Sequence, residues 1–198
     1  IWLVQVIHVP ASIATLLLLA FNIAALIGLQ LWSVLSNRHG RIKALGWGSS
    51  IWITACLLSM ALSPIAENSG RNALIPVVTL IMLVGLGAST AYLIPWSLLP
   101  DAIDADPTHP AGLYTAWMVF GQKLIIGLSM SVFGTLLSLT GYISTKSCDG
   151  ALNFVEQPQT ALIAIRLCMG LIPAILVALG LVVTVSYTHL RAHETIAD

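Results

Sequence analysis

The stretch YLIPWSLLPDAIDADPTHPAGLYTAWMVFGQKLIIGLSMSVFGTLLSLTG, residues 92–141, decides the fold, because it places one charge, Lys123, in the middle of an apolar run. The apolar part of this stretch that follows the acidic residues has the length and composition typical of a helix that spans a bilayer. Lys123 lies roughly ten residues into the run, or about 15 Å along a helix, near the middle of a hydrocarbon core about 30 Å thick. A lysine at that depth is costly unless it faces the bundle interior, a wet cavity or a counter-charge.

The partner of Lys123 is not evident from the sequence, because no other apolar segment carries Asp or Glu in its middle. The partner is therefore the substrate, a carboxylate on another part of the molecule, or helix-end carbonyls with water. A lysine that snorkels to one interface is the alternative. A helical wheel favours the functional interpretation, because four residues fall within about 60° of Lys123 on a face suited to packing. They are Ala116, Phe120, Gly127 and Gly134.

The composition places the chain in a membrane. Of its 198 residues, 58% are hydrophobic and only 8% are charged, whereas soluble domains carry about 25% charged residues. The net charge is zero, so we expect no nucleic-acid partner. Cys56, Cys148 and Cys168 show neither CxxC nor Cys/His spacing, and we interpret them as packing residues, with no disulfide and no metal site.

Five apolar runs, each long enough to cross a bilayer as a helix, follow one another along the chain. They cover residues 10–36, 44–63, 75–99, 111–140 and 160–184. Pro10 and Pro110 suit the first turn of a helix, and Pro64 is expected to close the second run. Pro95 lies inside the third run, where it should kink or interrupt the helix. The sequence therefore predicts an all-α, polytopic membrane helix bundle with about five transmembrane helices.

Two of these runs carry faces of small residues, which let a neighbouring backbone approach closely. The third run contains the patch Gly85, Gly87, Ala88, Ser89 and Ala91. The fourth run repeats small residues at intervals of three and four, at Gly127, Ser131, Gly134 and Ser138. Both faces predict close helix-to-helix packing.

The turn at residues 36–43 is the densest positive cluster in the chain. It holds Arg38, Arg41 and Lys43 around Gly40. Cytoplasmic loops of membrane proteins carry an excess of Lys and Arg, so we place this turn on the cytoplasmic side. The loop at residues 100–110 lies two spans further along the chain, and we expect it on the same side.

The run from Tyr92 to Asp104, followed by residues 112–114 and 120–124, resembles the glycoside-pentoside-hexuronide:cation symporters. These are melibiose-permease-like members of the major facilitator superfamily, and their branch includes sodium-dependent lysophosphatidylcholine symporters. The turn at 36–43 is similar to the Asp-Arg-x-Gly-Arg-Arg loop of that superfamily, with Asn37 in place of the acid. The resemblance extends from about Ala14 to Thr184 and matches the eighth to twelfth helices of a twelve-helix transporter.

This resemblance implies a domain organisation. Residues 1–184 would form the C-terminal transmembrane half-domain of such a transporter. We expect this half-domain to be truncated at the N-terminus, because the chain begins without methionine and within an apolar run of residues. Residues 185–198 resemble translated adapter read-through, and we interpret them as a non-native tail. The missing N-terminal half would then be an obligatory partner, and the protein would lie in the plasma (inner) membrane as a multi-pass protein surrounded by lipid.

The resemblance also implies the site. Lys123 matches an eleventh-helix lysine beside the substrate and cation sites, and Tyr92 matches an aromatic tenth-helix position that lines the sugar pocket. Trp96 and Gln122 are neighbours of these two residues. The implied function is cation-coupled symport of a sugar, glycoside or related small solute, with a lysolipid as the alternative. The implied protein is not an enzyme and needs no cofactor beyond a coupling Na⁺ or H⁺, bound mainly by acids of the absent half.

Asp101 and Asp104 leave several interpretations open. Their i, i+3 spacing puts two carboxylates on one helical face, which could chelate Mg²⁺ as in a membrane-embedded prenyltransferase. Such an enzyme needs a second Asp-rich motif, which this chain does not contain. In the symporter interpretation the acids lie on the cytoplasmic loop, where they cap helix N-termini or form a gating salt bridge with basic residues such as Arg38 and Arg41.

Overall fold

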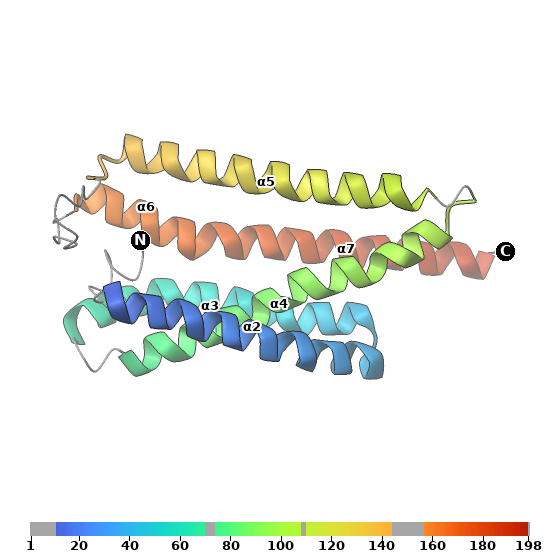
Figure 1. Cartoon of the computed structure of the whole chain (residues 1–198), viewed down its shortest axis with the longest axis horizontal. Coiled ribbons are helices and arrows are strands. Elements are labelled where there is room, and N and C mark those ends of the chain that lie inside the picture. Colours follow the sequence, from blue (N-terminus) through green and yellow to red (C-terminus); the bar gives the residue numbers. More distant parts are fainter. Residues whose placement is uncertain (1–10, 70–73, 108–109, 144–156, 198) are drawn as a thin grey trace. The chain divides into compact units, whose positions relative to one another are not determined.

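The computed structural model describes residues 11–69, 74–107, 110–143 and 157–197, and nearly all of them are helical (Figure 1). The helices are α2 (Ala11–His39), α3 (Arg41–Ser69), α4 (Leu74–Asp104), α5 (Ala111–Leu139), α6 (Gln159–Met169) and α7 (Leu171–Ala197). Five stretches of these helices are long and apolar enough to cross a membrane: Ile13–His39, Arg41–Leu62, Leu74–Asp104, Ala111–Leu139 and Gln159–Ser186. The predicted all-α membrane bundle with five spans is thereby confirmed.

Several predicted helix ends were wrong, and prolines account for most of the errors. α3 continues past Pro64 to Ser69, and α4 runs without interruption through Pro95 and Pro100 to Asp104. A proline removes one backbone hydrogen bond, but the remaining backbone hydrogen bonds of a long membrane helix can still form. The predicted loop at 100–110 is therefore shorter in the structure, because α4 includes its first residues.

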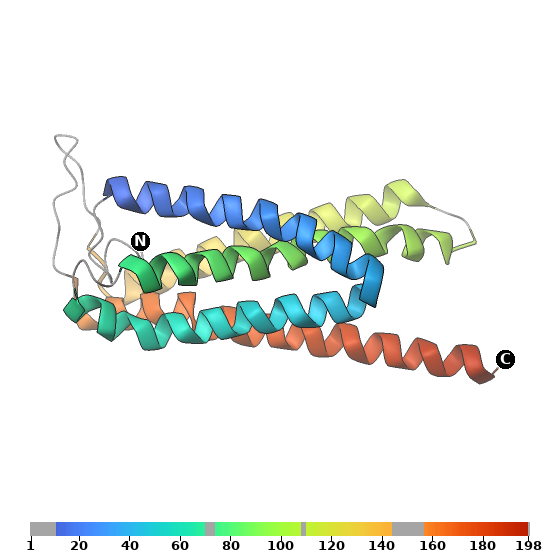
Figure 2. The ribbon, with the colours of Figure 1, turned by 90° about the horizontal axis from the view of Figure 1, so that it is seen from below.

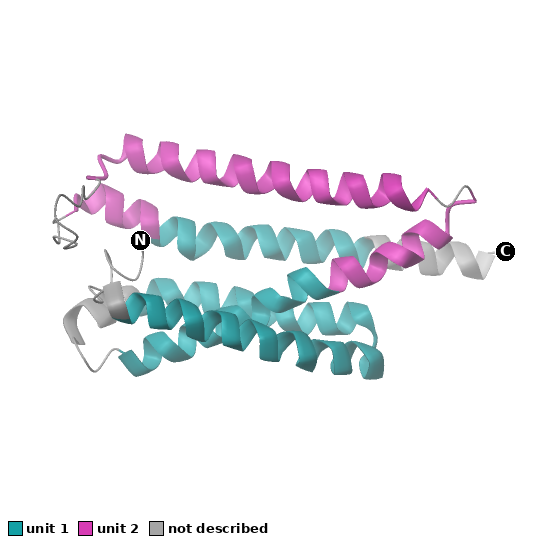
Figure 3. Ribbon diagram, viewed as in Figure 1, with its two compact units in different colours: residues 1–93, 166–198 teal, residues 94–165 magenta. Residues whose placement is uncertain are grey.

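Contacts divide the chain into two compact units, coloured teal and magenta in Figure 3. Unit 1 comprises residues 1–93 and 166–198, and unit 2 comprises residues 94–165. The division passes through α4 between Leu93 and Ile94. Tyr92 therefore belongs to unit 1, whereas Lys123 belongs to unit 2.

In unit 1, α3 packs against both α2 and α7, and Figure 2 shows α3 running alongside α7. The small-residue patch of α4 packs closely, as predicted. A Cβ at Gly85 would lie 2.6 Å from the carbonyl oxygen of Phe21 on α2. A Cβ at Gly87 would lie 2.8 Å from the backbone nitrogen of Trp52 on α3. Only glycine fits where two helix backbones come this close.

A buried tryptophan adds a directional bond to this packing. The indole Nε1 of Trp32 on α2 donates a hydrogen bond to the carbonyl oxygen of Leu86 on α4 at 2.8 Å. Trp32 is only 2% exposed, so this bond lies away from competing solvent. Cys56 is also buried in the core of unit 1, as expected of a packing residue. Cys148 lies outside the described residues.

In unit 2, side chains close the connection between α5 and α6. The buried amide of Gln157 accepts a hydrogen bond from the backbone nitrogen of Ile143 at 3.0 Å and donates one to its carbonyl oxygen at 2.9 Å. The hydroxyl of Thr160 donates to the carbonyl oxygen of Thr140 at 2.9 Å. Gly141 turns the chain after α5 with φ +76°. The described ends of this connection are therefore held together by side-chain amide and hydroxyl groups.

Candidate functional site

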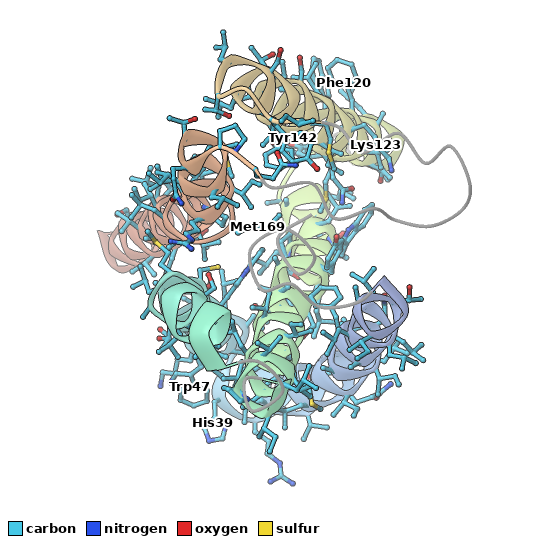
Figure 4. The ribbon with its side chains drawn as sticks, turned by 90° about the vertical axis from the view of Figure 1, so that its left-hand side faces the viewer. His39, Trp47, Phe120, Lys123, Tyr142 and Met169 are labelled. Atoms are coloured by element: carbon cyan, nitrogen blue, oxygen red, sulfur yellow. The ribbon has the colours of Figure 1, made fainter. Side chains whose placement is uncertain are left out.

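Lys123 lies close to the middle of α5, the helix that begins at Ala111 and ends at Leu139. At 1.5 Å per residue it is roughly 18 Å from the start of the helix, which agrees with the predicted mid-span depth. Its side chain is exposed and projects from α5 (Figure 4). Within the described residues of unit 2, its ammonium group makes no hydrogen bond or ion pair. The described part of unit 2 therefore presents this charge without neutralising it.

The predicted packing face of α5 is exposed in the described part of unit 2. Ala116 and Phe120 are exposed, and so are Gly127 and Gly134. A Cβ built at either glycine would meet no other described atom within 4 Å. Along the whole of α5, Leu137 is the buried residue. The described part of unit 2 therefore leaves this face uncovered, and its packing against another helix stays a prediction.

An aromatic pair precedes Lys123 on α5, and its geometry was not predicted. The rings of Trp117 and Phe120 meet edge to face, with centroids 5.8 Å apart and planes at 84°. Trp117 is 65% exposed and Phe120 is 56% exposed. The i, i+3 spacing of two aromatic residues was the available sequence signal. This pair adds an exposed apolar surface one turn from the lysine.

The structure places the other predicted site residues as follows. Trp96 is exposed and Gln122 is half-buried, both within unit 2. In the described part of unit 2, no hydrogen bond joins either of them to Lys123. Tyr92 is 62% exposed and belongs to unit 1. Since Tyr92 and Trp96 are four residues apart in one continuous helix, they lie on the same side of α4.

The acidic residues after Pro100 lie elsewhere than predicted. Asp101 and Asp104 are in the last turn of α4, not in a loop. Carboxylates at a helix C-terminus oppose the dipole of that helix, and the predicted role of this pair in capping the N-terminus of another helix stays a prediction. The N-cap of α5 is Pro110, which makes no side-chain capping bond. Asp106 instead accepts a hydrogen bond from the Tyr114 hydroxyl at 3.2 Å, a contact that the sequence did not reveal.

The basic residues flank a one-residue turn in unit 1. Arg38 lies in the last turn of α2 and Arg41 begins α3, with Gly40 between the helices at φ +92°. Both arginines are exposed. Asp101 and Asp104 belong to unit 2, whereas the two arginines belong to unit 1. A gating salt bridge between these acids and the arginines therefore stays a prediction.

Comparison with known proteins decides the family. The family described as MFS/sugar transport protein matches residues 4–189 of this chain. The chain belongs to this family. A protein named as an uncharacterized symporter in Synechocystis sp. is 32% identical over 181 residues, which is 89% of this chain and 31% of that protein. The human sodium-dependent lysophosphatidylcholine symporter 1 is 26% identical over 86% of this chain and 30% of its own length. No solved structure matches the chain.

Two conclusions follow for this MFS chain. It is an integral multi-pass membrane protein, because its family and its five apolar helices agree. Its matched relatives are symporters and transporters, not enzymes, which removes the prenyltransferase interpretation of Asp101 and Asp104. Among the described residues there is also no group of three or more His, Cys, Asp or Glu side chains that could hold a metal ion. The chain spans about a third of the length of the curated relatives it matches.

Proposed function

We propose that this MFS chain forms the C-terminal part of a cation-coupled symporter that moves a small solute by alternating access. The observation that carries the proposal is Lys123, a charge placed mid-helix in a membrane span with no partner in the described part of its unit. A charge at that depth is retained where it serves a substrate or ion pathway. Lys123 would hydrogen-bond the substrate or organise acids that bind the coupling Na⁺ or H⁺.

The uncovered face of α5 supports a further part of this proposal. The chain covers 31% of its Synechocystis relative, so we propose that the remaining helices cover α5 and supply the rest of the cavity wall and the cation site. Small residues such as Gly127 and Gly134 would allow those helices to approach closely. The complete transporter would then lie in the plasma membrane and hold its substrate near the midplane.

The substrate proposal rests on exposed aromatic residues of α4 and α5. Tyr92 and Trp96 offer flat apolar faces with polar tips, which suit a sugar ring or an amphiphile. A sugar-like solute is the first candidate, because the family description names sugar transport. A lysolipid is the second, because relatives carry that substrate in their names and because the exposed Trp117–Phe120 pair gives an acyl chain an apolar surface.

Uptake by the complete transporter in proteoliposomes tests the proposal and separates the two substrates. We expect a radiolabelled sugar or a radiolabelled lysolipid to accumulate when a Na⁺ or proton gradient is imposed, and an excess of the unlabelled compound to compete. Tyr92→Phe keeps the ring and removes the hydroxyl, so it should weaken sugar uptake more than lysolipid uptake. Failure of every compound in both classes to accumulate under either gradient would contradict the proposal.

The membrane topology gives a separate prediction. Positions 39 and 106 are separated by two membrane-spanning helices, α3 and α4, and so they should lie on the same, cytoplasmic, side. We expect a membrane-impermeant maleimide to label His39→Cys and Asp106→Cys from the same face in a background without native cysteines. Asn72→Cys, which is separated from position 39 by one span, serves as the control and should be labelled from the other face. Labelling of positions 39 and 106 from opposite faces would be incompatible with this arrangement.

A further inference from the structure

The α2–α3 hairpin concentrates its charge at one end. Residues 1–66 contain no Asp or Glu, and all of their Lys and Arg residues are Arg38, Arg41 and Lys43. Two membrane spans, Ile13–His39 and Arg41–Leu62, meet at Gly40, so these three charges gather at one membrane surface. The hairpin therefore presents a positive patch that no acidic residue of its own sequence balances.

Two of the three charges have no partner in the described part of the chain. Arg38 and Lys43 are exposed, and neither makes a hydrogen bond or an ion pair in the part of the chain that the structure describes. Lys43 also lies in the first turn of α3. Its positive charge is repelled by the positive end of the α3 dipole, and an external anion bound there would offset this repulsion.

Aromatic rings accompany the charges at the depth of the lipid headgroups. His39 and Trp47 meet edge to face with ring centroids 5.4 Å apart and planes at 63° (Figure 4). Trp47 is 45% exposed. It lies six residues after Arg41, or about 9 Å along α3, and tryptophan is enriched at this boundary between headgroups and hydrocarbon. The ring contact fixes the indole beside the basic turn.

We propose that this surface, formed by Arg38, His39, Lys43 and Trp47, is a binding site for the headgroup of an anionic phospholipid in the leaflet that the turn faces. The lipid phosphate would be held by Arg38 and Lys43, and Trp47 would pack against the glycerol and the upper acyl chain. Opposite charge selects an anionic headgroup over a zwitterionic one. The residues of this site belong to unit 1 and do not include Lys123, so the proposal does not depend on the transported solute.

Lipid retention on the complete transporter tests the proposal. Native mass spectrometry is used to titrate the purified protein with phosphatidylglycerol and with phosphatidylcholine of the same acyl chains. We expect wild type to prefer phosphatidylglycerol and the double variant Arg38→Gln/Lys43→Gln to bind it about 25-fold more weakly, because each basic residue near a membrane surface contributes about a factor of five. Arg71→Gln/Lys146→Gln removes the same charge elsewhere and should retain the preference. Equal loss in both double variants, or no preference in wild type, would overturn the proposal.

A second measurement leaves the charges of the turn unchanged. Phosphatidylglycerol brominated near the glycerol end of its acyl chains should quench tryptophan fluorescence more than the matching brominated phosphatidylcholine. We expect this excess to disappear in Trp47→Phe and to persist in Trp117→Phe. An excess that survives in Trp47→Phe would contradict the site, even if the double charge variant failed to fold.

Discussion

Replacing Lys123 by Ala is expected to lower gradient-driven uptake by the complete transporter roughly ten- to hundredfold. A hydrogen bond to a charged group contributes about 1.5–3 kcal/mol, which corresponds to that range of rates or affinities. Membrane insertion should be unaffected, since deleting a mid-span charge lowers the cost of insertion. The measurement is initial uptake in cells, normalised to the amount of inserted protein.

The variant Lys123→Arg separates the functional interpretation from snorkelling. It keeps the positive charge, but a planar guanidinium needs more room and presents its donors differently from a compact ammonium. We therefore expect poor uptake from this variant as well. The snorkelling interpretation predicts instead that the Ala and Arg variants both transport solute nearly normally. Near-wild-type uptake rates for both variants would contradict the assignment of Lys123 to the site.

The second large effect concerns the packing of unit 1. Gly87→Leu places a side chain against the backbone of Trp52, which cannot move without shifting α3. Overpacking of a core costs about 1–3 kcal/mol, and we expect about 3 kcal/mol here because a backbone is obstructed. Folded membrane proteins have little stability to spare, so we expect a large loss of monodisperse protein and a lower unfolding temperature in detergent.

Gly46 on α3 supplies the matched control, because a Cβ there meets nothing within 4 Å. Gly46→Leu should be tolerated, and Gly46→Ala should stabilise the helix by up to about 1 kcal/mol through helix propensity. Gly87→Ala should have the opposite sign, because its Cβ alone lies 2.8 Å from the Trp52 backbone nitrogen. Equal unfolding temperatures for the Gly87 and Gly46 variants would show that the α3–α4 approach is looser than the structure indicates.

The spans were predictable from sequence, whereas their ends were not. A membrane span is recognised from the summed hydropathy of about 20 residues, which does not depend on tertiary contacts. Five apolar runs therefore predict five spans. Whether a proline ends a helix depends on its neighbours, and α4 passes both Pro95 and Pro100. For the same reason Asp101 and Asp104 were assigned to a loop when they belong to the helix.

The candidate site was predictable only in part. The mid-helix position of Lys123 followed from its place in an apolar run, and the close approach at Gly85 and Gly87 followed from residue size. The edge-to-face geometry of Trp117 and Phe120 depends on side-chain rotamers, which no sequence pattern fixes. The assignment of Tyr92, Trp96 and Gln122 to the site rests on family resemblance and stays a prediction.

Gradient-driven accumulation tests the central claim most directly. The complete transporter is reconstituted into proteoliposomes, and solute uptake is followed with an inward Na⁺ gradient, with an inward proton gradient and with neither. A symporter should concentrate its solute above the external level under one of the two gradients, and dissipating that gradient with an ionophore should return the solute to equilibrium. Uptake that only equilibrates the solute, at the same rate under all three conditions, would contradict cation-coupled symport.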